Sequence, residues 1–155
     1  MSTLQKGSKA PDFEAQDQNG NRVSLKQYAG KKIILYFYPK DDTPGCTAEA
    51  CNLRDNYHTL TSKGFVVIGV STDPVTSHRK FADKYELPFT LVSDAEKKIV
   101  KAYGVWGEKK MYGKTYEGVK RTTFVIGEDG TIELILDKVD TKDHARQVLE
   151  ALGTH

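Results

Sequence analysis

The chain has only two cysteines, Cys46 and Cys51, among its 155 residues. Two are too few to hold a fold together by disulfides, and a reducing cytosol would keep such bonds open. They are also too few for a thiolate metal site unless histidines complete the ligand set. The four histidines show no ligand spacing relative to either cysteine, and we expect them on helices or at the surface: His58, His78, His144 and His155. We therefore expect no metal and no cofactor, and redox chemistry is the remaining use of the two thiols.

Long apolar runs and an excess of charge of one sign are also missing. No run approaches the roughly 20 apolar residues of a membrane-spanning helix, and residues 1–7 lack the apolar stretch of a secretion signal. The 23 basic and 21 acidic residues are scattered and leave a net charge of +2, whereas nucleic-acid binding usually shows a stronger basic bias. We expect one cytoplasmic domain over residues 1–155, without membrane or nucleic-acid partners.

The first half of the chain contains a strand, a helix and a strand in succession. Residues 32–38 and 65–70 are apolar runs rich in β-branched and aromatic residues, typical of strands buried on both faces. Residues 47–63 contain no proline or glycine, which predicts one helix that ends at Gly64. This spacing predicts parallel pairing of the two strands with a right-handed crossover.

The remaining segments complete an α/β pattern. Asn19-Gly20 predicts a hairpin near the N-terminus, and residues 105–118 are expected to form a loop. Further helices are predicted at 74–86, 95–103 and 143–152, and further strands at 89–92, 121–126 and 131–136. A βαβ half followed by a ββα half is the order of a thioredoxin-like fold. We expect a central mixed sheet flanked by helices, with an N-terminal hairpin extension.

The segment between the first buried strand and the first long helix carries the chemistry. Thr43 is a good N-cap and Pro44 a good first helical residue, which places Cys46 in the first turn. Backbone N–H groups are unpaired there and the helix dipole favours an anion, so the reactive thiolate is favoured. Gly45 allows a substrate to approach the backbone closely. The alternative is that Cys46 is an inert core residue.

Cys51 lies five residues after Cys46 on the same predicted helix. Ideal helix geometry separates their Cα atoms by about 8.5 Å and by about 140° around the axis, whereas a disulfide needs roughly 7 Å or less. A bond between the two thiols therefore requires the first turns to unwind. The alternative is that Cys51 is a buried bystander.

A resemblance to a known family rests on these residues. Pro39, Thr43 and Cys46, in the spacing P-x-x-x-T-x-x-C, match the active-site signature of the peroxiredoxins. The string over residues 43–51 is similar to the bacterioferritin comigratory protein, or PrxQ, branch of that family. Further matches extend over nearly the whole chain, at residues 7–13, 71–73, 91–94 and 121–126.

The resemblance implies a role for each matching residue. Cys46 would be the peroxidatic nucleophile and Thr43 would hydrogen-bond the peroxide. Pro39 would shield the thiolate from water, and Arg121 would stabilise the thiolate and polarise the O–O bond. Glu49 matches a position that orders the arginine, although it could equally be an ordinary first-turn carboxylate favoured by the helix dipole.

The implied activity is thiol-dependent reduction of hydroperoxides by a protein that is often a monomer. Cys46 becomes a sulfenic acid, Cys51 resolves it as a disulfide, and thioredoxin restores both thiols. Three alternatives are a redox sensor with the same cysteines, a non-catalytic thioredoxin-fold module, and a disulfide reductase, which the lack of C-x-x-C disfavours. The aromatic stretch could border the substrate mouth or form a covering loop through its large side chains Trp106, Met111, Tyr112 and Tyr116.

Overall fold

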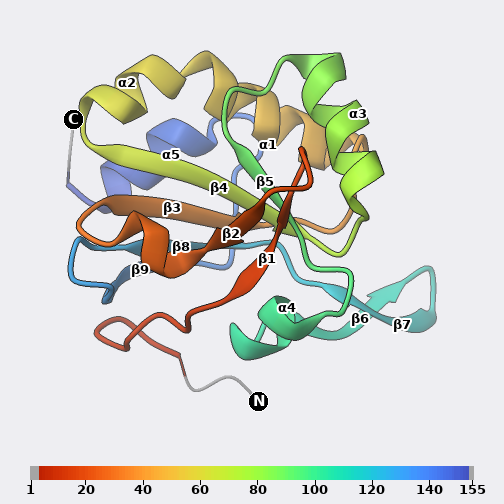
Figure 1. Ribbon diagram of the computed structural model, residues 1–155. Coiled ribbons are helices and arrows are strands. Elements are labelled where there is room, and N and C mark those ends of the chain that lie inside the picture. The colour runs from red at the N-terminus through yellow and green to blue at the C-terminus, as the bar shows by residue number, and fades with distance from the viewer. Residues whose placement is uncertain (1–3, 154–155) are drawn as a thin grey trace.

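The computed structural model describes residues 4–153, so His155 and residues 1–3 lie outside the described part. Its main feature is a seven-stranded sheet in the order β2-β1-β5-β4-β3-β8-β9 (Figure 1). These strands are β1 (Glu14–Asp17), β2 (Arg22–Ser24), β3 (Lys32–Phe37), β4 (Phe65–Ser71), β5 (Thr90–Ser93), β8 (Thr122–Ile126) and β9 (Ile132–Leu136). The central strands β3, β4 and β5 are parallel, whereas β1, β2, β8 and β9 pair antiparallel to their neighbours. The expected mixed sheet and N-terminal hairpin are confirmed.

Helices cover both faces of this sheet. They are η1 (Leu25–Tyr28), α1 (Pro44–Asp55), α2 (Tyr57–Ser62), α3 (Val75–Tyr85), α4 (Lys98–Ala102) and α5 (His144–Ala151). In Figure 1, α1, α2, α3 and α5 lie on one side of the sheet and α4 lies on the other. No helix in residues 4–153 is long and apolar enough to cross a membrane.

Strand β3 explains why both faces are covered. Successive side chains of a strand point to opposite faces, and almost every residue of β3 is buried. Ile34 and Tyr36 pack in the cluster that contains the buried side chains of α1, α2, α3 and α5. Leu35 and Phe37 pack in the second cluster, with α4 and the N-terminal segment. The continuous apolar run in the sequence therefore reflects a strand with a core on each side.

The helix expected at residues 47–63 is instead two helices. It begins at Pro44, as the Thr43-Pro44 pair predicts, but it breaks at Asn56, whose φ and ψ of −105° and 10° leave the helical region. The side-chain amide of Asn56 donates to the backbone carbonyl of Asn52 at 2.8 Å. Such local hydrogen bonds between side chain and backbone compete with helix continuation, so α1 ends at Asp55 and a separate helix, α2, starts at Tyr57.

Residues 105–118 are a β-hairpin and not the expected loop. β6 (Trp106–Met111) pairs antiparallel with β7 (Lys114–Val119) and forms a separate two-stranded sheet. The two residues of the turn, Tyr112 and Gly113, both have positive φ, 53° and 77°, as the tight turns of hairpins require. Tyrosine is uncommon in that conformation, which is why the sequence showed no turn signal here.

Candidate active site

Cys46 sits where the sequence placed it, in the first turn of α1 just beyond the C-terminal end of β3. Pro44 is the first helical residue and Thr43 is the N-cap. The side chain of Cys46 is 1% exposed and packs in the core cluster with residues of β3. The thiol is therefore shielded from bulk water at a helix N-terminus, where the unpaired backbone N–H groups favour negative charge.

Arg121 reaches the thiol from the neighbouring strand. It directly precedes β8, which pairs with β3, so the sheet brings it beside the start of α1. Its Nη2 donates to Sγ of Cys46 at 3.3 Å. Burial alone would lower the pKa of Arg121, but the charges of Cys46 and Glu49 and the hydrogen bonds to them raise it. The guanidinium therefore keeps its positive charge against the sulfur.

Gly45 makes room for this contact. A Cβ atom built on Gly45 would lie 3.1 Å from Nη2 of Arg121. That distance is shorter than ordinary van der Waals contact, so a side chain here would push the guanidinium away from the thiol. The sequence pointed to close approach at Gly45 by a substrate. The structure shows that the group in close approach is Arg121.

Glu49 fixes the other side of the guanidinium. It follows Cys46 by three residues on α1, is fully buried, and its Oε1 accepts a hydrogen bond from Nη1 of Arg121 at 2.7 Å. Burial raises the pKa of Glu49 to about 7, although the charge and hydrogen bond of Arg121 act in the opposite direction. Of the two readings of Glu49, an arginine partner or a simple first-turn carboxylate, the geometry favours the first.

Thr43 occupies the N-cap position but does not cap with its side chain. Its hydroxyl donates to the backbone carbonyl of Lys40 at 2.9 Å, while its own carbonyl accepts the N–H of Thr47 at 2.8 Å. The side chain therefore closes the loop that precedes α1. Thr43 and Pro39, at the two ends of that loop, are both half-buried.

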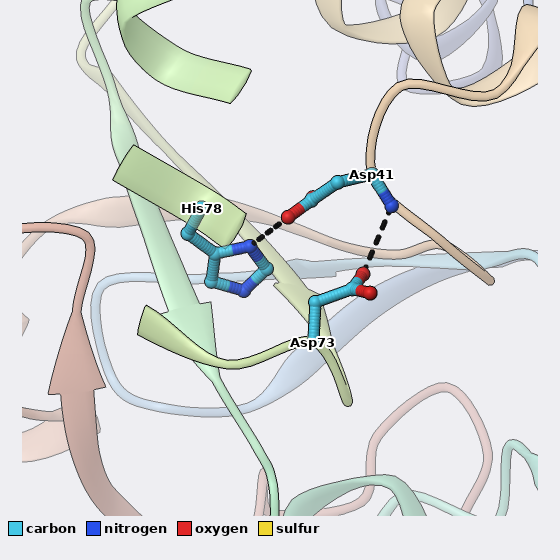
Figure 2. Close-up of side chains that lie close together, drawn as sticks. All are labelled: Asp41, Asp73 and His78. Atoms are coloured by element: carbon cyan, nitrogen blue, oxygen red, sulfur yellow. Dashed lines mark hydrogen bonds and ion pairs between the residues drawn. The ribbon is translucent and has the colours of Figure 1, made fainter. Parts of the chain in front are cut away.

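A buried polar cluster anchors the same loop to the sheet. Asp41, Asp73 and His78 point toward one another (Figure 2), and the backbone N–H of Asp41 donates to Oδ2 of Asp73 at 2.9 Å. Nδ1 of His78 lies 2.6 Å from Oδ2 of Asp41. Tyr38 and Ser77 also donate hydroxyl hydrogen bonds to the Asp41 carboxylate, at 2.6 and 2.8 Å. Asp41 is thus tied to β4, to α3 and to the end of β3.

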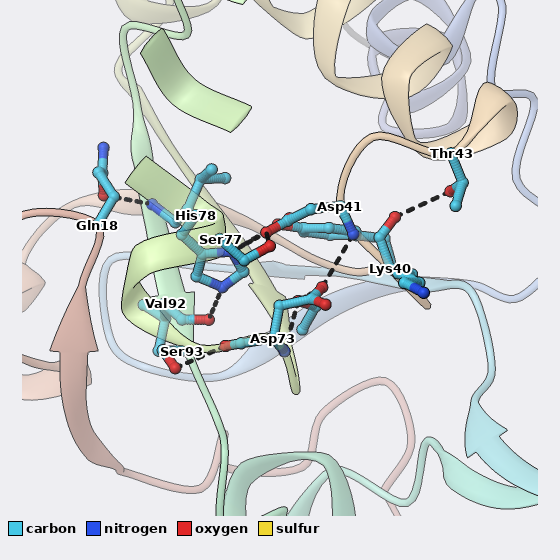
Figure 3. A network of polar contacts seen from close by, with 12 residues as sticks. Gln18, Lys40, Asp41, Thr43, Asp73, Ser77, His78, Val92 and Ser93 are labelled. Carbon is cyan, nitrogen blue, oxygen red and sulfur yellow. Dashed lines mark hydrogen bonds and ion pairs between the residues drawn. The ribbon is translucent and has the colours of Figure 1, made fainter. Parts of the chain in front are cut away.

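The hydrogen bonds of His78 define where its protons lie. Nε2 is 3.0 Å from the backbone carbonyl of Val92 on β5 (Figure 3), and because a carbonyl only accepts, Nε2 carries a proton. The 2.6 Å contact between Nδ1 and Oδ2 of Asp41 places one hydrogen atom between these two atoms. Three potential metal-ligand atoms of Asp41, Asp73 and His78 lie within 4.8 Å of one another, but protein hydrogen bonds already occupy them. We therefore assign the cluster to anchoring the loop.

Cys51 shares α1 with Cys46, and both thiols are free. Cys46 is buried, whereas Cys51 is half-buried on the same continuous helix. Because the helix is intact from Pro44 to Asp55, the two cysteines are held apart as the helical spacing required.

The β6–β7 hairpin borders the site through one residue. Lys109 on β6 donates to the backbone carbonyl of Val119 at 3.0 Å. Burial lowers the pKa of Lys109, and the charge of Arg121 lowers it further, whereas Cys46 opposes the shift. The side chain thus lies within electrostatic reach of the thiol. In contrast, Tyr112 at the hairpin tip is 96% exposed, and the ring of Trp106 packs under Nζ of Lys97 at 4.8 Å.

Two histidines at this end of the sheet were missed by the sequence reasoning. His78 and His144 lie on helices, as expected, but both are fully buried and hydrogen-bonded. His144 faces Glu49, with Nε2 at 3.5 Å from Oε2. The helical periodicity around His78 was a usable signal, since Phe81 and Ala82 lie on the same buried face. No sequence signal connects His144 with Glu49, because they are 95 positions apart in the printed sequence.

Comparison with known proteins identifies the family of this chain. Residues 6–135 match the AhpC/TSA family. The chain is 46% identical over 150 residues to the peroxiredoxin Bcp of Bacillus subtilis, which covers 97% of this chain and 96% of that protein. A PrxQ mutant from Xylella fastidiosa superposes with a TM-score of 0.91 at 32% identity, covering 99% and 98% of the two chains. The bacterioferritin comigratory protein of Xanthomonas campestris, studied for its alkyl peroxide reduction activity, has a TM-score of 0.87, 35% identity and coverage of 99% and 98%. The chain therefore belongs to the AhpC/TSA family, as a thiol-dependent peroxidase of the peroxiredoxin Bcp or PrxQ branch.

Proposed function

We propose that Cys46 is the peroxidatic nucleophile and that Arg121 is the residue that activates it. The observation that carries this assignment is the 3.3 Å contact between Nη2 of Arg121 and Sγ of Cys46 in a buried helix N-terminus. A guanidinium held by Glu49 on one side and touching sulfur on the other keeps the thiolate form available. It also places a charged donor where negative charge develops on the peroxide oxygens.

The proposed first step transfers two electrons from sulfur to the peroxide. The Cys46 thiolate attacks the terminal oxygen, the S–O bond forms and the O–O bond breaks, and water or an alcohol leaves after protonation. Cys46 is then a sulfenic acid. Thr43 would hydrogen-bond the peroxide after turning its hydroxyl from the Lys40 carbonyl, and Pro39 would exclude water from the thiolate.

The proposed second step uses Cys51 as the resolving thiol. It attacks the sulfur of the sulfenic acid, releases water and leaves an intramolecular Cys46–Cys51 disulfide. Because both thiols lie on an intact helix, the first turns of α1 must unwind to bring the sulfurs together. A thioredoxin-type dithiol then reduces the disulfide by exchange and is itself oxidised.

The proposed substrates are hydrogen peroxide and organic hydroperoxides. Support for the organic class comes from the Xanthomonas campestris relative, whose alkyl peroxide reduction activity was noted above. We further propose that residues 1–155 act as one domain and as a monomer in the cytoplasm, with no bound cofactor, metal, nucleic acid or membrane. The roles assigned here need only the chain's own side chains and an external dithiol.

The first test of this proposal is steady peroxide consumption with thioredoxin, thioredoxin reductase and NADPH. We expect Cys46→Ser to abolish NADPH oxidation because the nucleophile is gone. Cys51→Ser should consume about one equivalent of peroxide, then stop with sulfenic acid on Cys46. Continued turnover by Cys46→Ser would refute the assignment. Normal cycling by Cys51→Ser would show that another thiol resolves the sulfenic acid.

A further inference from the structure

Behind the Arg121–Glu49 ion pair, α5 brings a second titratable side chain to Glu49. His144 is the first residue of α5 and its side chain is 0% exposed. Its Nε2 lies 3.5 Å from Oε2 of Glu49, whose side chain is also 0% exposed. Oε2 is a buried oxygen with no hydrogen-bond partner among residues 4–153. A buried carboxylate oxygen without a donor is costly, so this contact needs an explanation.

The proton positions on His144 follow from the amide of Gln147. That amide donates from Nε2 to the carbonyl of Lys138 at 2.8 Å, and its Oε1 accepts the N–H of Asp140 at 2.8 Å. The amide orientation is therefore defined. Nδ1 of His144 lies 2.9 Å from the same Oε1 and must donate to it. In neutral His144 the proton is on Nδ1, and Nε2 presents a lone pair.

That lone pair faces two groups. Oγ1 of Thr123 lies 2.8 Å from Nε2 and can donate its hydroxyl hydrogen to it. The second group is Oε2 of Glu49. If Glu49 were ionised and His144 neutral, the Thr123 hydroxyl could donate to Nε2, but Oε2 of Glu49 would remain a buried anionic oxygen without a donor. One additional proton removes this conflict, whether it sits on Oε2 or on Nε2.

We propose that Glu49 and His144 hold one proton between them and that this proton controls how strongly Arg121 acts on Cys46. When the pair holds the proton, the positive charge of Arg121 is directed to the Cys46 thiolate and the peroxide. When the pair loses it, the Glu49 anion competes with the thiolate for the guanidinium. His144 is then a positioning residue, which acts through Glu49 and Arg121. The inference rests on the proposed role of Cys46.

The other charged and titratable neighbours agree with a proton held near neutral pH. Burial raises the pKa of Glu49 to about 7, with Arg121 opposing it. Burial lowers the pKa of His144, and Arg121 lowers it further, while the hydrogen bond to Gln147 and the charge of Asp140 act against this. Tyr36 remains neutral because burial and then the charges of Glu49 and Cys46 raise its pKa. The pair can therefore exchange a proton near neutral pH. Lys109, whose pKa is lowered by burial and by the charge of Arg121, is the other group near the thiol that could lose a proton on the alkaline side.

The consequence is a descending limb in the pH profile of Cys46 oxidation. As the pH rises through the ionisation of the pair, the pair gains one negative charge beside Arg121 and disfavours the thiolate. The second-order rate constant with hydrogen peroxide should therefore fall on the alkaline side. An ionisation of Cys46 alone would produce the opposite trend, because more thiolate forms as the pH rises.

The test is the pH profile of this rate constant, measured between pH 5 and 9.5 in single-turnover experiments on the reduced protein. In His144→Asn the amide can donate to Oε2 of Glu49 and stabilise its ionised form, so the limb should move to lower pH by about one unit. In Glu49→Gln the group that titrates is gone, and the limb should disappear. His58→Asn, at an exposed position on α2, is the matched control and should retain the wild-type profile.

Each outcome decides the proposal. A wild-type profile without a descending limb would overturn it, and so would a limb that stays at the same pH in His144→Asn. Should His144→Asn fail to fold, Glu49→Gln decides alone, because a limb that survives in it belongs to another group. Peroxide consumption by Cys46→Ser would refute the proposed function itself. If the descending limb does not move in His144→Asn while Cys46→Ser consumes no peroxide, only the proposal of a shared proton is refuted, and the proposed function stands.

Discussion

Arg121 is the residue on which the chemistry of this site depends most. Its two terminal nitrogens contact different partners, Sγ of Cys46 at 3.3 Å and Oε1 of Glu49 at 2.7 Å. A guanidinium offers two donors in a fixed planar arrangement, whereas a lysine ammonium is a single point charge on a flexible stem. Gly45 leaves the space that this arrangement needs. A positive charge alone therefore cannot reproduce the two simultaneous contacts with Cys46 and Glu49.

We expect Arg121→Lys to slow the oxidation of Cys46 by hydrogen peroxide by about 100-fold, as is typical when one preorganised donor is lost. The lysine retains the charge but cannot contact Cys46 and Glu49 with parallel donors. The measurement is the second-order rate constant in single turnover. Arg146→Lys is the control, since Arg146 pairs with Glu150 on the exposed side of α5. A rate constant within threefold of wild type for Arg121→Lys would contradict the role of the planar guanidinium.

A smaller change at Gly45 tests the same geometry. Gly45→Ala places a methyl group 3.1 Å from Nη2 of Arg121, so the guanidinium must shift by a few tenths of an ångström. We expect the rate constant for Cys46 oxidation to fall by about tenfold, because displacements smaller than 1 Å at a reacting centre are costly. Thermal unfolding should change little, since the side chain that shifts, Arg121, is partly exposed. An unchanged rate constant would show that the guanidinium adapts without loss.

At the level of elements, the loop between β3 and α1 is held by residues far from it in the chain. Asp41 is the anchor point, with bonds to Tyr38, Asp73, Ser77 and His78. The backbone up to Asp41 is held to the sheet by these hydrogen bonds. In contrast, α1, which follows Thr43, must unwind for the proposed disulfide. We therefore expect the proposed unwinding to stop at this cluster.

This anchor predicts a stability effect. We expect His78→Ala to lower the free energy of unfolding by about 3–5 kcal/mol, because it leaves the buried Asp41 carboxylate without its main partner. Urea denaturation at pH 7 measures the change, with His58→Ala on the exposed side of α2 as the control. A loss below about 1 kcal/mol would mean that Asp41 finds another partner, and the anchoring role would have to be abandoned.

The elements that could be predicted are those whose signals are local. The apolar run of β3, the Pro44 helix start and the hairpin turn at Asn19-Gly20 are each encoded within a few residues, and each was confirmed. The β6–β7 hairpin was missed because its turn uses a tyrosine at positive φ. The break at Asn56 was missed because it depends on one side-chain hydrogen bond that composition does not reveal.

For the molecule as a whole, the site is assembled from three distant parts of the chain. The start of α1 supplies Cys46 and Glu49, the residue before β8 is Arg121, and α5 near the C-terminus supplies His144. The family motif predicted the first two parts. It could not predict the third, because the contact between His144 and Glu49 arises only when α5 packs against α1 on one face of the sheet (Figure 1).

We propose that one chain closes a Cys46–Cys51 disulfide by unwinding a helix that is intact in the reduced state. Trypsin cleaves after Lys40 and after Arg54, so both cysteines lie on one peptide, residues 41–54. Mass spectrometry of peroxide-treated protein, digested without reduction, measures the outcome directly. We expect this peptide with two hydrogens fewer and no free thiol. Two such peptides joined to each other, or a peptide that carries only oxidised Cys46 beside a free Cys51, would contradict it.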